Sequence, residues 1–199
     1  MDTARKDYMV EIMNIGIGRA CVVLSELVGA RVNLTVPEVD IFRAGEIHGQ
    51  MEIFKDERII SVTENFKGNL QGEAILVLSN YSGLLLTHRL NQYLNDTAEI
   101  QSGKRETVTE VGNIVLNSLV GSWSEILNDH FKFGVPEYLE CTLSELLDRR
   151  IAGSANSGKE LYAICANTHF DITEFFIMGT IIALFDKSSV ENLFGTKLA

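Results

Sequence analysis

The first thirty residues of the chain show the spacing of an amphipathic helix followed by a strand. Apolar residues recur there at steps of three and four, which places them on one face of a helix. They are Met9, Ile12, Met13, Gly16, Ala20, Val23 and Leu27. Gly29 stands where a glycine commonly ends a helix. Residues 31–37 alternate in steps of two up to Pro37, which predicts a short strand.

The rest of the first half continues with strands and a helix. The runs at residues 58–66 and 70–79 predict two more strands. Ser82 stands where it would cap a helix after the second strand. The first half therefore predicts the order helix, strand, short helix or loop, strand, strand and helix.

The second half predicts the same order of elements. A second long amphipathic helix has an apolar face made of Val108, Val111, Gly112, Val115, Leu119 and Ile126. Thr142 and Glu145 have the spacing of a capping box, which predicts the start of a further helix. Residues 131–136, 160–170 and 174–186 predict three more strands.

The two halves are also related residue by residue. A shift of 99 positions, the difference between 11 and 110, superposes identical residues. The pairs are Glu11 with Glu110, Asn14 with Asn113, Ile15 with Ile114, Ser25 with Ser124, Glu26 with Glu125, Pro37 with Pro136 and Glu38 with Glu137. The pattern resumes later with a shift longer by eight residues, which predicts an insertion near residues 153–159. Such self-similarity indicates two copies of one structural unit.

These observations predict an α+β fold with pseudo-two-fold symmetry from an internal duplication. We expect a six-stranded, mainly antiparallel sheet and two long helices that present the candidate sites. The chain would form a single domain, residues 1–199, built from one repeat at residues 1–98 and a second at residues 99–199.

Charge and cysteine content narrow the range of functions. A formal net charge of −10 argues against binding to nucleic acid or to an anionic membrane surface. Cys21, Cys141 and Cys165 are widely spaced, and the four histidines are scattered, so neither a disulfide framework nor a metal site is expected. The N-terminus lacks the pattern of a secretory signal, and the longest apolar run, residues 175–185, is about half of the ~20 residues that span a membrane. We therefore expect a cytoplasmic protein.

Polar residues line the face of each long helix that lies opposite the apolar face, at about 100° of rotation per residue. Asn is a mediocre helix residue, because its side chain competes for backbone hydrogen bonds. Its recurrence beside a Glu in both repeats favours a functional role over a solvated surface retained by chance after duplication. The candidate residues are Asp7, Glu11 and Asn14 in the first helix and Glu106, Glu110 and Asn113 in the second.

The spacing of these residues resembles the signature of the CheC/CheX/FliY family of chemotaxis phosphatases, Asp-x-x-x-Glu-x-x-Asn followed by twenty-two residues and Pro. The first copy matches it in full, with Asp7, Glu11, Asn14 and Pro37. The second copy matches it with Glu110, Asn113 and Pro136, whereas Glu106 stands where the family usually has Asp or Ser. Two copies in one chain are the arrangement of CheC, so the resemblance covers essentially the whole sequence.

The resemblance implies hydrolysis of the aspartyl phosphate of a CheY-type receiver domain. Phosphoryl transfer passes through a loose transition state, so it needs a water held in line more than it needs a strong base. The resemblance implies that Asn14 and Asn113 orient this water and that Glu11 and Glu110 engage a lysine of the receiver. Asp7 and Glu106 would support them, and the two prolines would be structural.

The resemblance also bears on cofactors and partners. It implies that this chain binds no cofactor, because the receiver brings its own Mg²⁺, and it suggests the deamidase CheD as a further partner. A different class of function is a non-catalytic interaction module like the FliM middle domain, which resembles this fold but lacks the Glu and Asn pairs. A glycosidase that used Glu11 and Glu110 is disfavoured, because the two carboxylates belong to separate helices without an aromatic sugar platform.

Overall fold

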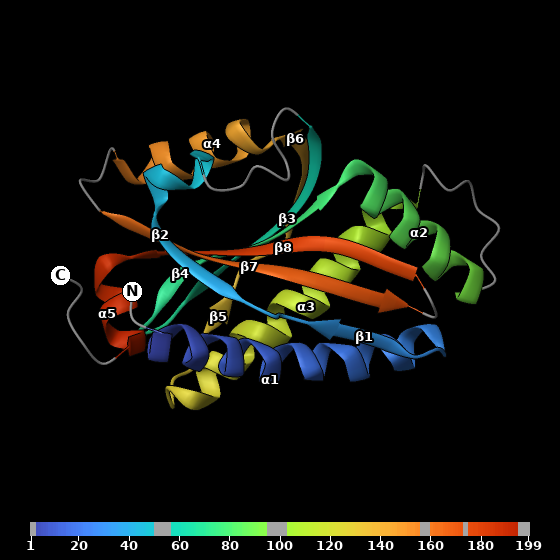
Figure 1. Cartoon of the computed structure of the whole chain (residues 1–199), viewed down its shortest axis with the longest axis horizontal. Helices are drawn as coiled ribbons and strands as arrows, with labels where there is room; N and C mark the ends of the chain where they lie inside the picture. Colours follow the sequence, from blue (N-terminus) through green and yellow to red (C-terminus); the bar gives the residue numbers. More distant parts are fainter. Residues whose placement is uncertain (1–2, 50–56, 95–102, 156–159, 173–174, 195–199) are drawn as a thin grey trace.

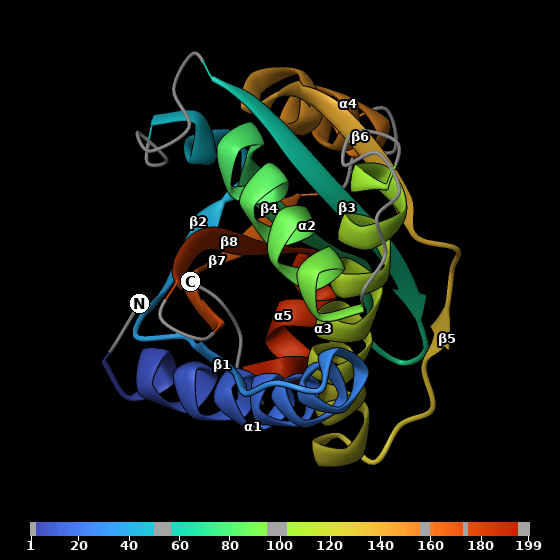
Figure 2. The ribbon, with the colours of Figure 1, turned by 90° about the vertical axis from the view of Figure 1, so that its right-hand side faces the viewer.

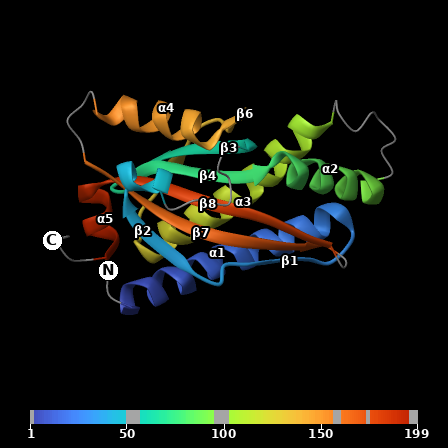
Figure 3. The ribbon, with the colours of Figure 1, turned by 45° about the horizontal axis from the view of Figure 1, so that its top comes forward.

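A single antiparallel sheet lies between two layers of helices in the computed structural model, which describes residues 3–49, 57–94, 103–155, 160–172 and 175–194. The first half contains α1 (Thr3–Val28), β1 (Val32–Thr35), β2 (Val39–Arg43), the 3-10 helix η1 (Ala44–Gly49), β3 (Arg58–Lys67), β4 (Gln71–Ser79) and α2 (Asn80–Leu94). The second half contains α3 (Lys104–Ile126), β5 (Lys132–Phe133), β6 (Glu137–Thr142), α4 (Leu143–Ala155), β7 (Leu161–Ile172), β8 (Phe175–Asp186) and α5 (Lys187–Phe194). Helices α1 and α3 cover one face of the sheet, and α4 covers the other (Figures 1 and 3).

The sheet joins the two halves by exchanging their short strands. Its order is β1-β7-β8-β4-β3-β5, with β2 also paired to β7 and β6 also paired to β3. Strands β1 and β2 of the first half therefore pair with β7 of the second half, while β5 and β6 pair with β3 of the first half. Strands β4 and β8 pair with each other across the centre. This reciprocal pairing confirms the predicted α+β fold with pseudo-two-fold symmetry.

The sheet contains eight strands among the described residues, two more than the six that the sequence pattern predicts. The additional strands are β2 and β6, each of which begins within two residues after the proline of its repeat. Both are short and carry charged residues, so they lack a clear alternation of apolar and polar positions. Their strand character comes from pairing with a long strand of the other half, which is a contact between residues far apart in the sequence.

The larger core lies between the sheet and helices α1 and α3. Trp123 of α3 is fully buried there, and its ring packs against Phe66 of β3 and Phe185 of β8 at centroid distances of 6.0 and 5.5 Å. A smaller core lies on the other face, under α4 and η1. Arg19 of α1 forms a two-fold hydrogen-bonded ion pair with Glu125 of α3, at 2.7 Å for each bond, and so joins the two long helices at the surface.

Glycines let both long helices approach their neighbours closely. A Cβ atom on Gly112 of α3 would lie 2.6 Å from the Cβ of Val62 in β3, which is closer than two carbons can pack. A Cβ on Gly16 of α1 would lie 2.7 Å from the Cα of Leu119 in α3. Gly112 therefore sets α3 directly against β3, one residue before Asn113 (Figure 2).

Most predicted helix positions are confirmed, with three exceptions on the apolar faces. Val23, Leu27 and Ile126 are exposed, because the buried face of α1 continues through Leu24 and Val28 and that of α3 ends at Trp123. Val23 and Leu24, three and four positions after Ala20, both fit a helical pattern, and the structure buries Leu24.

The predicted helix ends are partly confirmed. Gly29 has a positive φ of 64° at the end of α1, and Thr142 and Glu145 form the reciprocal bonds of a capping box. Ser82 does not cap α2; it donates its backbone N–H to the Oγ of Ser79, so Ser79 takes that role.

The boundary expected between the two repeats, near residue 98, lies outside the described residues, as do residues 156–159 of the expected insertion.

Helix α1 is long and apolar enough to cross a membrane by length and composition, a test that core helices of globular domains also pass. Its buried face packs in the larger core.

Candidate functional site

The candidate residues of the first repeat lie along one face of α1. The side chains of Asp7 and Glu11 are exposed, and Asn14, one turn after Glu11, is half-buried. Helix α1 places Glu11 and Asn14 beside each other because residues three apart lie on the same side of a helix. The three residues thus lie along one side of α1, whereas their role as a site stays a prediction.

The amide of Asn14 is bonded to the backbone at the end of β1. Its Nδ2 donates to the backbone oxygens of Val36 and Val10, at 2.9 Å each, and its Oδ1 accepts the backbone N–H of Val36 at 3.0 Å. Val36 is itself buried. Both donors of the Asn14 amide and one lone pair of its oxygen are thus engaged within the chain.

Asn14 is the first of three α1 side chains that bond the outer edge of the β1 segment. The Sγ of Cys21 accepts the N–H of Leu34 at 3.0 Å, and the Oγ of Ser25 accepts the N–H of Val32 at 2.9 Å. The other edge of β1 pairs with β7. Side chains of α1 therefore satisfy backbone groups that a neighbouring strand would otherwise bond.

The candidate residues of the second repeat have the same places on α3 but different contacts. Glu106 and Glu110 are exposed, and Asn113 is half-buried. The Oδ1 of Asn113 accepts a hydrogen bond of 2.7 Å from the Nδ2 of Asn117, one turn further along. Val135, the counterpart of Val36, is 86% exposed. In contrast to Asn14, Asn113 is bonded within its own helix.

The prolines of the two motifs occupy equivalent breaks in the sheet. Pro37 lies between β1 and β2, and Pro136 lies between β5 and β6. In each half the chain leaves one short strand at the proline and then pairs again with the same long strand of the other half. Each proline thus lies where the backbone pairing of the sheet is interrupted, so its missing N–H removes no hydrogen bond from the sheet.

A carboxylate outside the two motifs lies in the core. Glu64 of β3 is 2% exposed, and its Oε2 has no hydrogen-bond partner among the described residues. Burial raises the pKa of Glu64 to about 7, although the side chain of Asn117 on α3 opposes this rise. A sequence signal was present, because Glu64 follows Ile60 and Val62 in the alternation of the core-facing side of β3.

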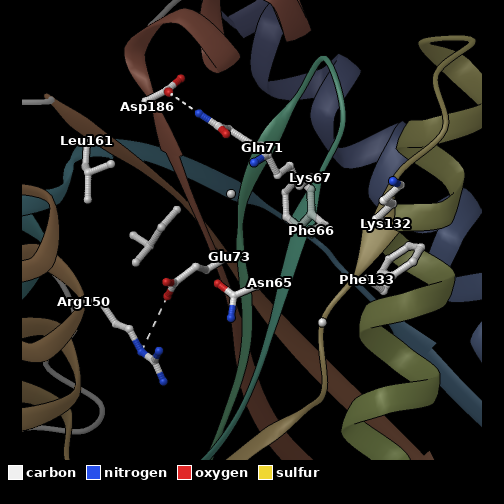
Figure 4. Close-up of a pocket in the computed structure, with 13 residues that line it drawn as sticks. Asn65, Phe66, Lys67, Gln71, Glu73, Lys132, Phe133, Arg150, Leu161 and Asp186 are labelled. Atoms are coloured by element: carbon white, nitrogen blue, oxygen red, sulfur yellow. Dashed lines mark hydrogen bonds and ion pairs between the residues drawn. The ribbon is translucent and has the colours of Figure 1, made fainter.

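The described structure also contains a pocket of about 600 Å³ that lies away from the motifs. Glu73 and Arg150 point toward each other there, with Oε2 and Nε 3.5 Å apart, and Gln71 donates to Asp186 at 3.1 Å (Figure 4). No motif Glu or Asn lines this pocket or a second one of about 300 Å³. Among the described residues, no group of three or more His, Cys, Asp or Glu side chains could hold a metal ion.

An exposed apolar stripe accompanies the polar residues of α1. Tyr8, Ile15 and Val22 follow each other at seven-residue steps and are 41%, 46% and 59% exposed. This spacing places them on one side of the helix, with Glu11 between the first two. The candidate site of the first repeat is therefore an exposed helix face with mixed apolar and acidic character.

No family model matches the sequence. Several solved structures have a similar fold. FliY from Thermotoga maritima is 18% identical, with a TM-score of 0.71, over 98% of this chain and 96% of that chain. A chain of the CheX–CheY–BeF3–Mg²⁺ complex from Borrelia burgdorferi is 17% identical, with a TM-score of 0.51, over 88% of this chain and 99% of its own length. A chain of the FliG–FliM complex from H. pylori is 12% identical, with a TM-score of 0.59, over 94% of this chain and 95% of its own length.

These likenesses extend over nearly the full length of each chain that is compared. The chain therefore shares the fold of FliY, CheX and FliM, which confirms at the level of the fold the resemblance to the CheC/CheX/FliY family carried by its two Glu-x-x-Asn motifs.

Proposed function

We propose that this protein is a phosphatase that hydrolyses the aspartyl phosphate of a CheY-type receiver domain in the cytoplasm. The observation that carries the proposal is the pair of Glu and Asn residues repeated on the outer faces of two long helices. Support comes from the shared fold with CheX, of which one relative was crystallised with CheY, BeF3 and Mg²⁺.

The chemistry fits an exposed helix face rather than a cavity. The receiver would supply the phosphoryl group, the Mg²⁺ and a lysine, so this chain needs to add a carboxylate for docking and an amide for water. Glu110 could pair with the lysine in a charge-assisted contact that strengthens as the interface excludes water. Asn113 could hold the attacking water in line with the phosphorus atom without acting as a base.

The site of the second repeat needs less rearrangement than that of the first before its Asn could hold a water. The Oδ1 of Asn113 keeps one lone pair beyond its bond from Asn117, and that bond joins two side chains rather than fixing a strand. Asn14 would have to break its bonds with Val36 before its nitrogen could meet a water or a receiver. We therefore assign most of the turnover to Glu110 and Asn113, with Glu106 in a supporting place.

The first repeat has the better docking surface. The apolar stripe of Tyr8, Ile15 and Val22 flanks Glu11. A protein partner would bury these apolar side chains and pair with the charged one. The counterparts of these residues on α3 are Thr107, Ile114 and Gly121, which offer less exposed apolar surface. Receiver binding at α1 would thus depend on Glu11 and its apolar neighbours, with Asp7 adding negative charge.

A second candidate function is a non-catalytic interaction module. The engagement of Asn14 with Val36 favours it for the first repeat, and a chain of a FliG–FliM complex shares the fold. Under this alternative the chain would bind a receiver without shortening the life of its phosphoryl group. CheD stays a prediction from the resemblance.

The test is the lifetime of the phosphoryl group on a CheY-like receiver charged with acetyl phosphate and Mg²⁺. We expect wild-type protein to shorten this lifetime in a saturable way. We expect the double variant Asn14→Ala, Asn113→Ala to leave it unchanged while still binding the receiver. A lifetime that wild type does not alter, despite measurable binding, would favour the non-catalytic module.

A further inference from the structure

The two long helices differ at the position one turn after the motif Asn. Gly18 stands four residues after Asn14, and Asn117 stands four residues after Asn113. A Cβ atom on Gly18 would meet nothing within 4 Å, so close packing does not require a glycine there. Asn117 is half-buried and lies on the same side of α3 as Asn113. The second repeat therefore places another amide beside its motif amide, whereas the first repeat does not.

The bond from Asn117 reaches the same atom by which the first repeat holds its strand. The Oδ1 of Asn14 accepts the backbone N–H of Val36 at 3.0 Å, and Val36 is 2% exposed. The Oδ1 of Asn113 instead accepts the Nδ2 of Asn117 at 2.7 Å. Val135, which corresponds to Val36, lies in solvent. Each motif amide is therefore held through its oxygen, on α1 by the backbone and on α3 by a side chain.

The two ways of holding the amide leave its nitrogen in different states. The Nδ2 of Asn14 donates to the backbone oxygens of Val10 and Val36, so both of its N–H groups are engaged. The Nδ2 of Asn113 donates no hydrogen bond to any of the described residues. With one bond to its oxygen, Asn113 keeps one lone pair and both N–H groups for groups outside the chain. The bond from Asn117 thus holds the amide without using up the groups that a water or a partner would meet.

We propose that Asn117 is a positioning residue that fixes the orientation of the Asn113 amide for the attacking water. This inference rests on the proposed phosphatase function for its purpose, but not for its geometry. Without Asn117, the amide of Asn113 loses its one hydrogen bond within the described residues and can rotate about its side-chain bonds. A water is held in line only by a group that is itself held, because a small misplacement lowers the rate strongly. Asn117 therefore acts through Asn113 and does not touch the reacting atoms.

The direct test measures the mobility of the Asn113 side-chain amide by NMR relaxation in the free protein. We expect its NH₂ group, assigned from its loss in Asn113→Ala, to be ordered in wild type. Asn117→Ala should release it, and this variant should fold because Ala has a higher helix propensity than Asn. Asn117→Gln should keep it ordered, because a Gln at this spacing can still donate to the Asn oxygen. The matched control is Ser118→Ala, which truncates the next half-buried side chain of α3 and should leave the mobility unchanged.

Turnover of a phosphorylated CheY-like receiver gives the second readout, in a Glu11→Ala background so that the α3 site dominates. We expect Asn117→Ala to lower kcat on the order of 10-fold with KM unchanged, and Asn117→Gln to restore most of the loss. An Asn113 amide that is equally ordered with and without Asn117 would overturn the inference, as would an Asn117→Ala protein with the kcat of its Glu11→Ala parent. If Asn117→Ala releases the amide while wild type hydrolyses no receiver, the positioning of Asn113 stands and the phosphatase proposal fails.

Discussion

Asn14 and Asn113 show that one residue type at equivalent positions can have two different roles. Asn14 bonds both backbone groups of Val36 and holds that residue in the core. Asn113 bonds Asn117, and the counterpart Val135 is left in solvent. An amide with two donors and two acceptor sites can serve either purpose. The motif therefore fixes the position of the amide, whereas the residues around the amide determine which hydrogen bonds it forms.

At the residue scale, Glu64 also predicts a pH dependence of stability. Its pKa is raised from 4.5 to about 7 in the folded protein, so folding favours the protonated form. The contribution is fully present below the pKa of the unfolded chain and is lost as the pH rises through about 7. The loss amounts to roughly 3 kcal/mol in the free energy of unfolding.

The measurement compares urea unfolding of wild type and Glu64→Gln between pH 4 and 8. The difference between the two proteins isolates Glu64 from the other carboxylates. We expect the variant to gain stability relative to wild type as the pH rises, with most of the change between about pH 4.5 and 7. A constant difference over this range would show that Glu64 is not buried as a weakly acidic carboxyl group.

At the scale of elements, α1 and β1 are joined by side chains rather than by backbone pairing. Asn14, Cys21 and Ser25 lie along one side of α1 and meet the N–H groups of alternate residues, Val36, Leu34 and Val32. Because alternate N–H groups of a strand point to the same edge, one row of helical side chains can serve them all. The helix thereby protects an edge that would otherwise be open.

This arrangement predicts unequal costs for two matched substitutions. Asn14→Ala removes three hydrogen bonds and leaves the buried N–H of Val36 without an acceptor, so we expect a loss of about 2 kcal/mol in the free energy of unfolding. Asn113→Ala removes one bond near the surface and should cost less than about 1 kcal/mol. Urea midpoints at constant slope measure both. Equal losses would contradict the joining of α1 to β1 by Asn14.

Sequence patterns predicted the elements whose character is local. The long helices follow from apolar spacing, and the repeated Glu and Asn residues follow from a comparison of the two halves. Strands β2 and β6 were missed because their pairing partners belong to the other half of the chain. The bond between Asn14 and Val36 joins residues 22 positions apart, and no local pattern reports it. Glu64 was detectable in principle, as a charge on the apolar side of a strand.

At the scale of the whole molecule, the exchange of strands makes each half depend on the other. Strands β1 and β2 have their ladder with β7, and β5 and β6 have theirs with β3. The ring of Trp123, the one tryptophan of the chain, packs against Phe66 of the first half and Phe185 of the second. The larger core is therefore shared between the repeats.

We expect the protein to unfold in one cooperative transition. Trp123 fluorescence reports the shared core, and far-UV circular dichroism reports all helices and strands, so their denaturant curves should coincide. Two separate transitions would show that one repeat holds its structure without the other, in conflict with the observed pairing.

We propose that the amide of Asn113 takes part in hydrolysis, whereas that of Asn14 mainly holds the fold. The most direct measurement is kcat for dephosphorylation of a CheY-like receiver by Asn113→Ala and by Asn14→Ala, each at a saturating concentration and a temperature where it is folded. We expect kcat to fall on the order of 100-fold in Asn113→Ala. In Asn14→Ala we expect a fall of a few-fold at most. An Asn113→Ala protein that retains wild-type kcat would rule out a part for this amide in hydrolysis.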